Sequence, residues 1–123
     1  MTCNGVYVNG RLLGDTGWIN LAYASGFTDA TAGQIGYRVK NGIVFIRGGA
    51  AGTISEGVYQ VVTADAIPAE YRPTQHFRTG GMGSSMRGNV GIEVNANDGL
   101  IRLGWNGGTR PAWFGAGCSY PVD

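Results

Sequence analysis

The chain has 123 residues, 23 of them glycine, and a formal net charge of +1 with only 14% charged residues. This length suits one hydrophobic core, and the glycine content without a G-X-Y repeat excludes collagen and indicates many tight turns. The near-neutral charge without a basic stripe argues against nucleic acid as a partner. No apolar run approaches the ~18 residues of a membrane span, so no membrane insertion is expected.

Residues 1–15 are predicted to form a lead-in segment before one domain at 16–123. Asn9-Gly10 can turn a minor hairpin between Val6–Val8 and Arg11–Leu13. Met1–Gly10 lacks the charged-then-apolar order of a signal peptide, so we expect synthesis in the cytoplasm. A terminal disulfide between Cys3 and Cys118 is conceivable, but a reducing cytoplasm favours two free thiols.

A first hairpin is predicted over Ile35–Gly48, after a strand at Trp18–Ala22 and a polar loop at Ser25–Thr31. Asn41-Gly42 tolerates the positive φ of a type I′ turn and lies between runs of alternating apolar and polar residues. One face is apolar and carries Tyr37, Val39, Val44 and Ile46. The other face mixes Arg38, Lys40 and Arg47 with Ile43 and Phe45, so either a partner subunit covers it or Phe45 lies under the arginine stems.

The middle of the chain is expected to alternate loops and strands. Gly48–Gly57 is rich in glycine and alanine and is predicted to be a loop before a strand at Val58–Val62. Ile67–Pro73 contains two prolines and is predicted to be an ordered, extended crossover in which Arg72 pairs with a carbonyl or a carboxylate. A strand at Gln75–Thr79 and a flexible loop at Gly80–Gly88 follow.

A second hairpin is predicted over Val90–Trp105. A two-residue loop at Asp98-Gly99 would set Val94 opposite Leu103 and Ile92 opposite Trp105. Asn106–Pro111 would then turn into a last strand at Ala112–Ser119. The chain therefore reads as all-β and antiparallel, with about eight strands and no helical period.

The order of these segments resembles the C-terminal receptor-binding heads of tailed-bacteriophage tail fibres and tail-tip proteins. The resemblance covers roughly Gly17–Pro121. It rests on W-I-N-L, Y-R-V-K-N-G-I-V-F-I-R-G, I-P-A-E-Y-R-P, V-G-I-E-V-N-A-N-D-G-L-I-R-L and A-W-F-G-A-G-C-S-Y-P, in that order. It implies a jelly-roll-like β-sandwich head, homotrimeric and joined to other tail or fibre proteins of the virion, that attaches the particle to bacterial surface glycans.

The chemistry of the chain argues for binding rather than catalysis. His76 is the one histidine, and no G-x-S-x-G, H-E-x-x-H or P-loop pattern occurs, so we expect no enzyme activity, no metal and no cofactor. Two alternatives stay open. One is a purely structural trimerising cap, and the other is a glycan-cleaving tailspike-type enzyme built on two close carboxylates.

Sugar sites use aromatic faces for the apolar side of a pyranose and planar polar groups for its hydroxyls, and such residues gather on loops. We therefore expect the saccharide site to include Trp113, His76, Arg87, Asn106 and Arg110. In a trimer, loops at one end of neighbouring subunits approach each other, so a groove between subunits is a plausible location.

Overall fold

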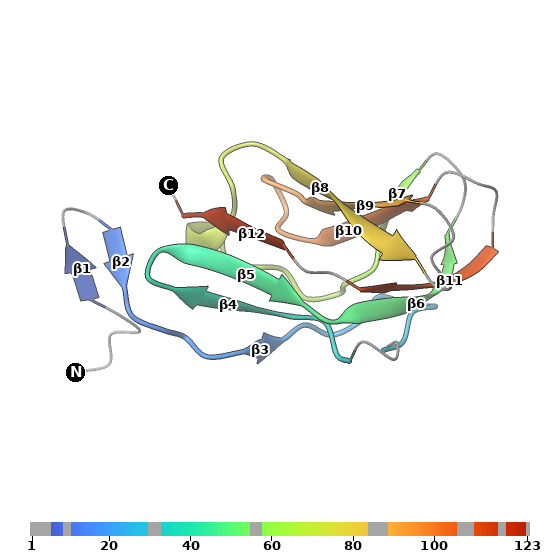
Figure 1. Ribbon diagram of the computed structural model, residues 1–123, viewed down its shortest axis with the longest axis horizontal. Coiled ribbons are helices and arrows are strands. Elements are labelled where there is room, and N and C mark those ends of the chain that lie inside the picture. The colour runs from blue at the N-terminus through green and yellow to red at the C-terminus, as the bar shows by residue number, and fades with distance from the viewer. Residues whose placement is uncertain are drawn as a thin grey trace.

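The computed structural model describes residues 6–8, 11–29, 33–54, 58–83, 89–105, 110–115 and 118–122. These residues form two antiparallel sheets packed face to face, with a separate two-stranded hairpin near the N-terminus (Figure 1). The predicted all-β antiparallel sandwich is thus confirmed.

The smaller sheet has the strand order β12-β5-β4-β3. Its strands are β3 (Ile19–Asn20), β4 (Gly36–Lys40), β5 (Ile43–Arg47) and β12 (Cys118–Pro121). The first hairpin has the predicted register, with Val39 opposite Val44 and Tyr37 opposite Ile46. Asn41 and Gly42 have φ of 51° and 78°, as a type I′ turn requires.

The larger sheet has the strand order β6-β11-β8-β9-β10-β7. Its strands are β6 (Gly49–Ile54), β7 (Tyr59–Val61), β8 (Phe77–Gly83), β9 (Asn89–Val94), β10 (Ile101–Trp105) and β11 (Arg110–Gly115). Its centre is the second hairpin with β8 added alongside β9.

The second hairpin differs from the predicted register by two residues. Ile101 pairs with Val94, and Trp105 pairs with Val90 rather than Ile92. The connection is longer than two residues because Asn95 Oδ1 accepts hydrogen bonds from the N–H groups of Asn97 and Asp98, which closes a wider turn. A shift of two preserves the side-chain face, so the predicted apolar face survives.

Two predicted loops are partly strands. Gly49–Ile54, expected within a loop, is β6 and pairs with β11, and the predicted loop at Gly80–Gly88 begins inside β8, which runs to Gly83. Glycine has a low strand propensity, which favours a loop. Here the hydrogen-bonded pairing with other strands overrides that propensity. The predicted last strand at Ala112–Ser119 is two strands, β11 and β12, in different sheets. With the N-terminal hairpin, these changes give twelve strands in the described residues.

The crossover at Ile67–Pro73 contains a short 3₁₀ turn, η1 (Ala69–Tyr71). The predicted anchoring of Arg72 is confirmed, since its Nε donates to the Ile67 carbonyl at 2.7 Å and an Nη donates to the Asn97 carbonyl at 3.0 Å. Arg72 therefore ties the crossover to the turn between β9 and β10.

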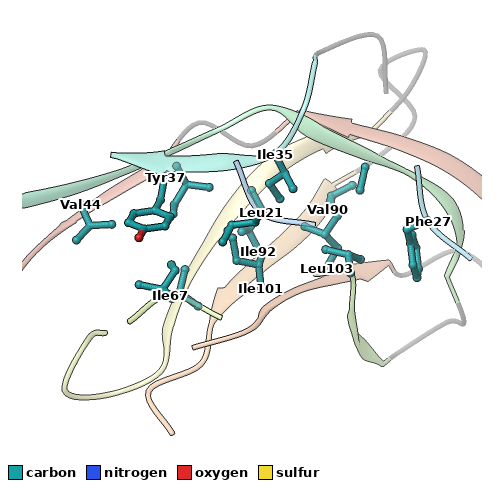
Figure 2. Close-up of a cluster of buried hydrophobic side chains, with 14 of the residues drawn as sticks. Leu21, Phe27, Ile35, Tyr37, Val44, Ile67, Val90, Ile92, Ile101 and Leu103 are labelled. Atoms are coloured by element: carbon teal, nitrogen blue, oxygen red, sulfur yellow. The ribbon is translucent and has the colours of Figure 1, made fainter. Parts of the chain in front are cut away.

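The hydrophobic core lies between the two sheets (Figure 2). Ile35, Tyr37 and Val44 face it from one side, and Ile92, Ile101 and Leu103 face it from the other. Thr63 is a fully buried polar residue, and its hydroxyl accepts the N–H of Ile101. Its buried oxygen is therefore satisfied.

The N-terminal segment forms the predicted minor hairpin from β1 (Val6–Val8) and β2 (Arg11–Leu13), with Val8 opposite Arg11. Asp15, at the end of this segment, forms a salt bridge with Arg38 of β4. The division at residue 15 stays a prediction. Within the described ranges, no helix has the length and apolar character needed to cross a membrane.

Candidate functional site

An open cavity of about 270 Å³ lies where the segment before β8 meets β12. Its described lining is Pro73, Thr74, Gln75, His76, Phe77, Tyr120 and Pro121. The segment 73–77 follows the crossover that Arg72 anchors, and Tyr120 and Pro121 end the last strand. Residues more than 40 positions apart in the chain therefore form one concave surface.

The aromatic part of this cavity is the pair Phe77 and Tyr120, whose ring centroids lie 5.2 Å apart at an interplanar angle of 40°. Tyr120 is buried, and its hydroxyl donates to the Tyr71 carbonyl at 2.8 Å. Burial raises the pKa of Tyr120, so the ring stays a neutral phenol. The hydrogen bond fixes the buried ring behind the half-buried Phe77.

His76 is exposed, and its Nδ1 accepts a 3.0 Å hydrogen bond from the backbone N–H of Ala96. When the imidazole is neutral, this bond requires the ring proton to be on Nε2. His76 is thereby joined to the turn between β9 and β10.

That turn is itself held by side chains. Asp98 forms a salt bridge with Arg102 at 2.8 Å and accepts the N–H of Leu100. The hydrogen bond from Arg102, opposed by partial burial and assisted by the Leu100 N–H, lowers the pKa of Asp98. Together with Arg72 on the Asn97 carbonyl, these contacts give His76 a firm support.

Of the other predicted site residues, the two that the structure describes, Arg110 and Trp113, do not lie beside His76 within one chain. Arg110 and Trp113 belong to β11, paired with Ile54 and Ala51 of β6, and their side chains lie outside what the structure describes. Since Phe114 of β11 pairs with Gly83 of β8, Arg110 and His76 are roughly 35 Å apart at the rise of a strand. Arg87 and Asn106 lie outside the described residues. A ligand contacting both ends would need a groove between copies, and that site stays a prediction.

The sequence by itself does not point to Phe77, Tyr120 or the two prolines as residues of a cavity. Tyr120 belongs to the aromatic-rich final segment, and Pro73 belongs to the crossover. Their meeting depends on β12 pairing with β5, a long-range contact that no local pattern reports.

A second surface lies on the outer side of the smaller sheet. The Arg47 guanidinium lies 4.1 Å from the centroid of the Trp18 ring, and that of Arg38 lies 5.9 Å from it. Phe45 is half-buried directly opposite Arg38, while Ile43 is 39% exposed. Arginine and tryptophan thus cover part of the apolar residues on this face, and Ile43 is left open to solvent.

Neither surface, as far as its residues are described, has the groups of a metal centre. Among the residues that the structure describes, no three His, Cys, Asp or Glu side chains come close enough to hold a metal ion. Cys118 is a free thiol, and burial raises its pKa to about 11, so it is a poor nucleophile. Cys3 lies outside the described residues.

Comparison with solved structures identifies the fold. The structure is similar to the crystal structure of the head domain of the lactococcal phage bIL170, with a TM-score of 0.67 over 86% of this chain and 97% of that chain. The two sequences are 20% identical. A scan against known protein families and a search of curated proteins found no match.

The bIL170 head is described among the receptor-binding domains of lactococcal phages. The chain therefore has the fold of a phage receptor-binding head domain, and the predicted resemblance is confirmed at the level of the fold.

Proposed function

We propose that this chain is a receptor-binding head of a tailed phage or a prophage-derived particle, and that it attaches the particle to saccharides on the host cell surface. The observation that carries the proposal is the fold shared with the bIL170 head over 86% of the chain. It acts in the virion tail, together with other tail or fibre proteins, and it binds rather than cleaves its receptor.

The cavity beside His76 supports binding of a small polar ligand, because it combines aromatic and proline surfaces with a few polar groups. Three of the described carboxylates favour binding over glycan cleavage, because each already forms an ion pair. Asp15, Glu93 and Asp98 are each joined to an arginine, so their charges are already used within the fold.

The head works as a homotrimer in this proposal. Ile19 and Ile43, both 39% exposed on the smaller sheet, offer apolar surface for contact between copies. Avidity then provides the mechanism, because tethered copies raise overall affinity by roughly 10² to 10⁴ without new contacts.

Fluorescently labelled protein tests the attachment directly. We expect it to stain susceptible bacteria and to be displaced by cell-wall polysaccharide purified from the same strain. Staining that persists after surface glycans are removed would indicate a protein receptor. Absence of staining on a panel of hosts would favour a purely structural cap. Release of reducing ends from the polysaccharide would instead support the tailspike-type enzyme.

Light scattering tests the assembly. A mass three times that of the 12.9 kDa chain at micromolar concentration is the expected result. A monomer mass would contradict the trimer while leaving the attachment experiment valid.

A further inference from the structure

We propose that the cavity lined by His76, Phe77 and Tyr120 binds one uncharged sugar ring of the host glycan. This inference rests on the proposed receptor-binding function and specifies the ligand of one site. It depends on four features of the cavity: its size, the absence of charge in its described lining, the remaining hydrogen-bond capacity of His76 and the rigidity of its walls.

The size of the cavity suits a single ring. Pockets for drug-sized ligands have volumes of roughly 300 to 1,000 Å³, and this cavity, at about 270 Å³, lies just below that range. Because it is open to solvent, a polysaccharide can place one residue inside and continue outward. A long stretch of sugar chain would not fit.

The described part of the lining favours an uncharged ligand over a strongly charged one. None of the described lining residues is Lys, Arg, Asp or Glu. The nearest arginine in the chain after the cavity, Arg78, is paired with Glu93 at 2.7 Å, and Arg72 before it donates to two backbone carbonyls. A phosphate or carboxylate in the cavity would therefore lack a dedicated cation, which favours a neutral sugar over an anionic polymer unit.

The polar groups match sugar hydroxyls. Nδ1 of His76 accepts the hydrogen bond from the Ala96 N–H, so the neutral ring can still donate through Nε2–H. No hydrogen bond joins Nε2–H to another described residue. Gln75, exposed beside it, carries an amide that both donates and accepts. Phe77, half-buried and packed against the buried ring of Tyr120, supplies an apolar surface of the kind that packs against the C–H face of a pyranose.

The walls are held in place before any ligand arrives. Tyr120 is fixed by its bond to the Tyr71 carbonyl, His76 by Ala96, and the two prolines restrict the backbone on either side. Such preorganisation lowers the entropic cost of binding.

Titration of the ¹⁵N-labelled full chain, followed by NMR, tests the inference. The neutral probes are glucose, rhamnose and N-acetylglucosamine, and the anionic probes are glycerol 1-phosphate and N-acetylneuraminic acid. We expect at least one neutral sugar, at millimolar concentration, to shift the amide signals of Gln75, His76, Phe77 and Ala96. The anionic probes should leave these signals in place.

Two substitutions separate a ligand contact from a structural role. His76→Asn retains a side-chain acceptor for the Ala96 N–H but removes the Nε2–H donor, so it should weaken sugar binding roughly tenfold while the protein stays folded. Asn20→Ala is the matched control, because Asn20 is exposed on β3, at the opposite edge of the smaller sheet from β12 (Figure 1). It should bind as the parent does.

Three results would overturn the inference: no neutral sugar shifting the cavity signals, an anionic probe shifting them more strongly, or His76→Asn binding as well as the parent. If labelled protein stains bacteria while the cavity signals stay unmoved, the receptor-binding function stands and its site lies elsewhere. If a neutral sugar enters the cavity but no host is stained, the site is real and the proposed function is wrong.

Discussion

Arg78 Nε lies 2.7 Å from Oε2 of Glu93, and this pair joins an arginine that is 56% exposed to a carboxylate that is 3% exposed. Asn95 donates to the other carboxylate oxygen at 3.2 Å, and the Arg78 guanidinium lies 4.7 Å from the centroid of the Tyr59 ring. Burial by itself raises the pKa of Glu93, but the hydrogen bonds from Arg78 and Asn95 outweigh it and lower the pKa. The buried charge therefore depends on an exposed partner.

Replacing Arg78 with Ala should destabilise the fold by roughly 1 to 3 kcal/mol at pH 7, because Glu93 would stay buried with Asn95 as its remaining side-chain partner among the described residues. With its lowered pKa, Glu93 stabilises the native state above the unfolded pKa of about 4.3, and this contribution is lost as the pH falls. The difference between variant and parent should therefore shrink in acid.

Urea unfolding at pH 7 and pH 4 measures this difference. In the double variant Arg78→Ala with Glu93→Gln, the cost should be smaller than the sum of the single costs, since no unpaired charge remains. Additive costs would mean that the two side chains act independently.

We expect the stability at low pH of the segment that joins β2 to β3 to depend on the ionisation of Asp15. The hydrogen bond from Arg38, followed by the one from the Gly17 N–H, lowers the pKa of Asp15 to about 2. The stabilisation is present above the unfolded pKa of about 3.9 and is lost as the pH falls toward 2. Asp15→Asn should flatten the pH dependence of unfolding in this window.

A carboxyl-carbon NMR titration of Asp15 checks the same claim without a substitution. A midpoint close to 3.9 would show that the contact with Arg38 does not persist in solution.

Gly48 occupies the corner where the chain passes from β5 in the smaller sheet to β6 in the larger one. Its φ is 93°, and an added Cβ would lie 2.6 Å from the Gln34 carbonyl carbon and 2.8 Å from Ile35 Cα. Gly48→Ala should therefore cost roughly 2 to 4 kcal/mol, through backbone strain and a clash with main-chain atoms.

Gly80 provides the matched control for Gly48, because a Cβ there would meet nothing within 4 Å. Gly80→Ala should change the free energy of unfolding by no more than about 0.5 kcal/mol. Equal melting temperatures for the two variants would contradict the corner geometry.

Leu103 tests which face of the second hairpin packs into the core. It is 1% exposed, pairs with Ile92 and faces the core, so Leu103→Ala should cost roughly 2 to 5 kcal/mol through lost burial and a residual cavity. Val58→Ala, at a residue that is 51% exposed, should be nearly neutral. Thermal melting of both variants measures the contrast, and similar losses would place Leu103 outside the core.

Arg110, the first residue of β11, and Asn106, which lies outside the described residues, remain candidates for a second saccharide contact. Asn106→Ala and Arg110→Ala should each weaken binding to host cells by about 1 to 3 kcal/mol, the cost of leaving a polar partner unpaired, with little effect on folding. Quantitative staining of susceptible bacteria measures this. Parent-level staining by both variants would remove these residues from the site.

The local features of this fold could be predicted from the sequence because they depend on neighbours in the chain. Asn41-Gly42 dictates a type I′ turn, and strict alternation then sets Val39 and Val44 on one face. The same alternation defined the apolar face of the second hairpin. The predicted register of this hairpin was wrong by two residues because the Asn95 side chain widens the turn. The predicted face was still right because side chains alternate along a strand with a period of two residues.

The long-range pairings were decided only by the tertiary structure. Gly49–Ile54 has the composition of a loop, and it is a strand because β11, about 60 residues later, supplies its hydrogen-bond partners. In the same way, His76 could be singled out as a binding residue by its chemistry, but its neighbours Phe77 and Tyr120 could not. They meet only because β12 returns to pair with β5, and the free energy of such contacts comes from burial between sheets rather than from local sequence.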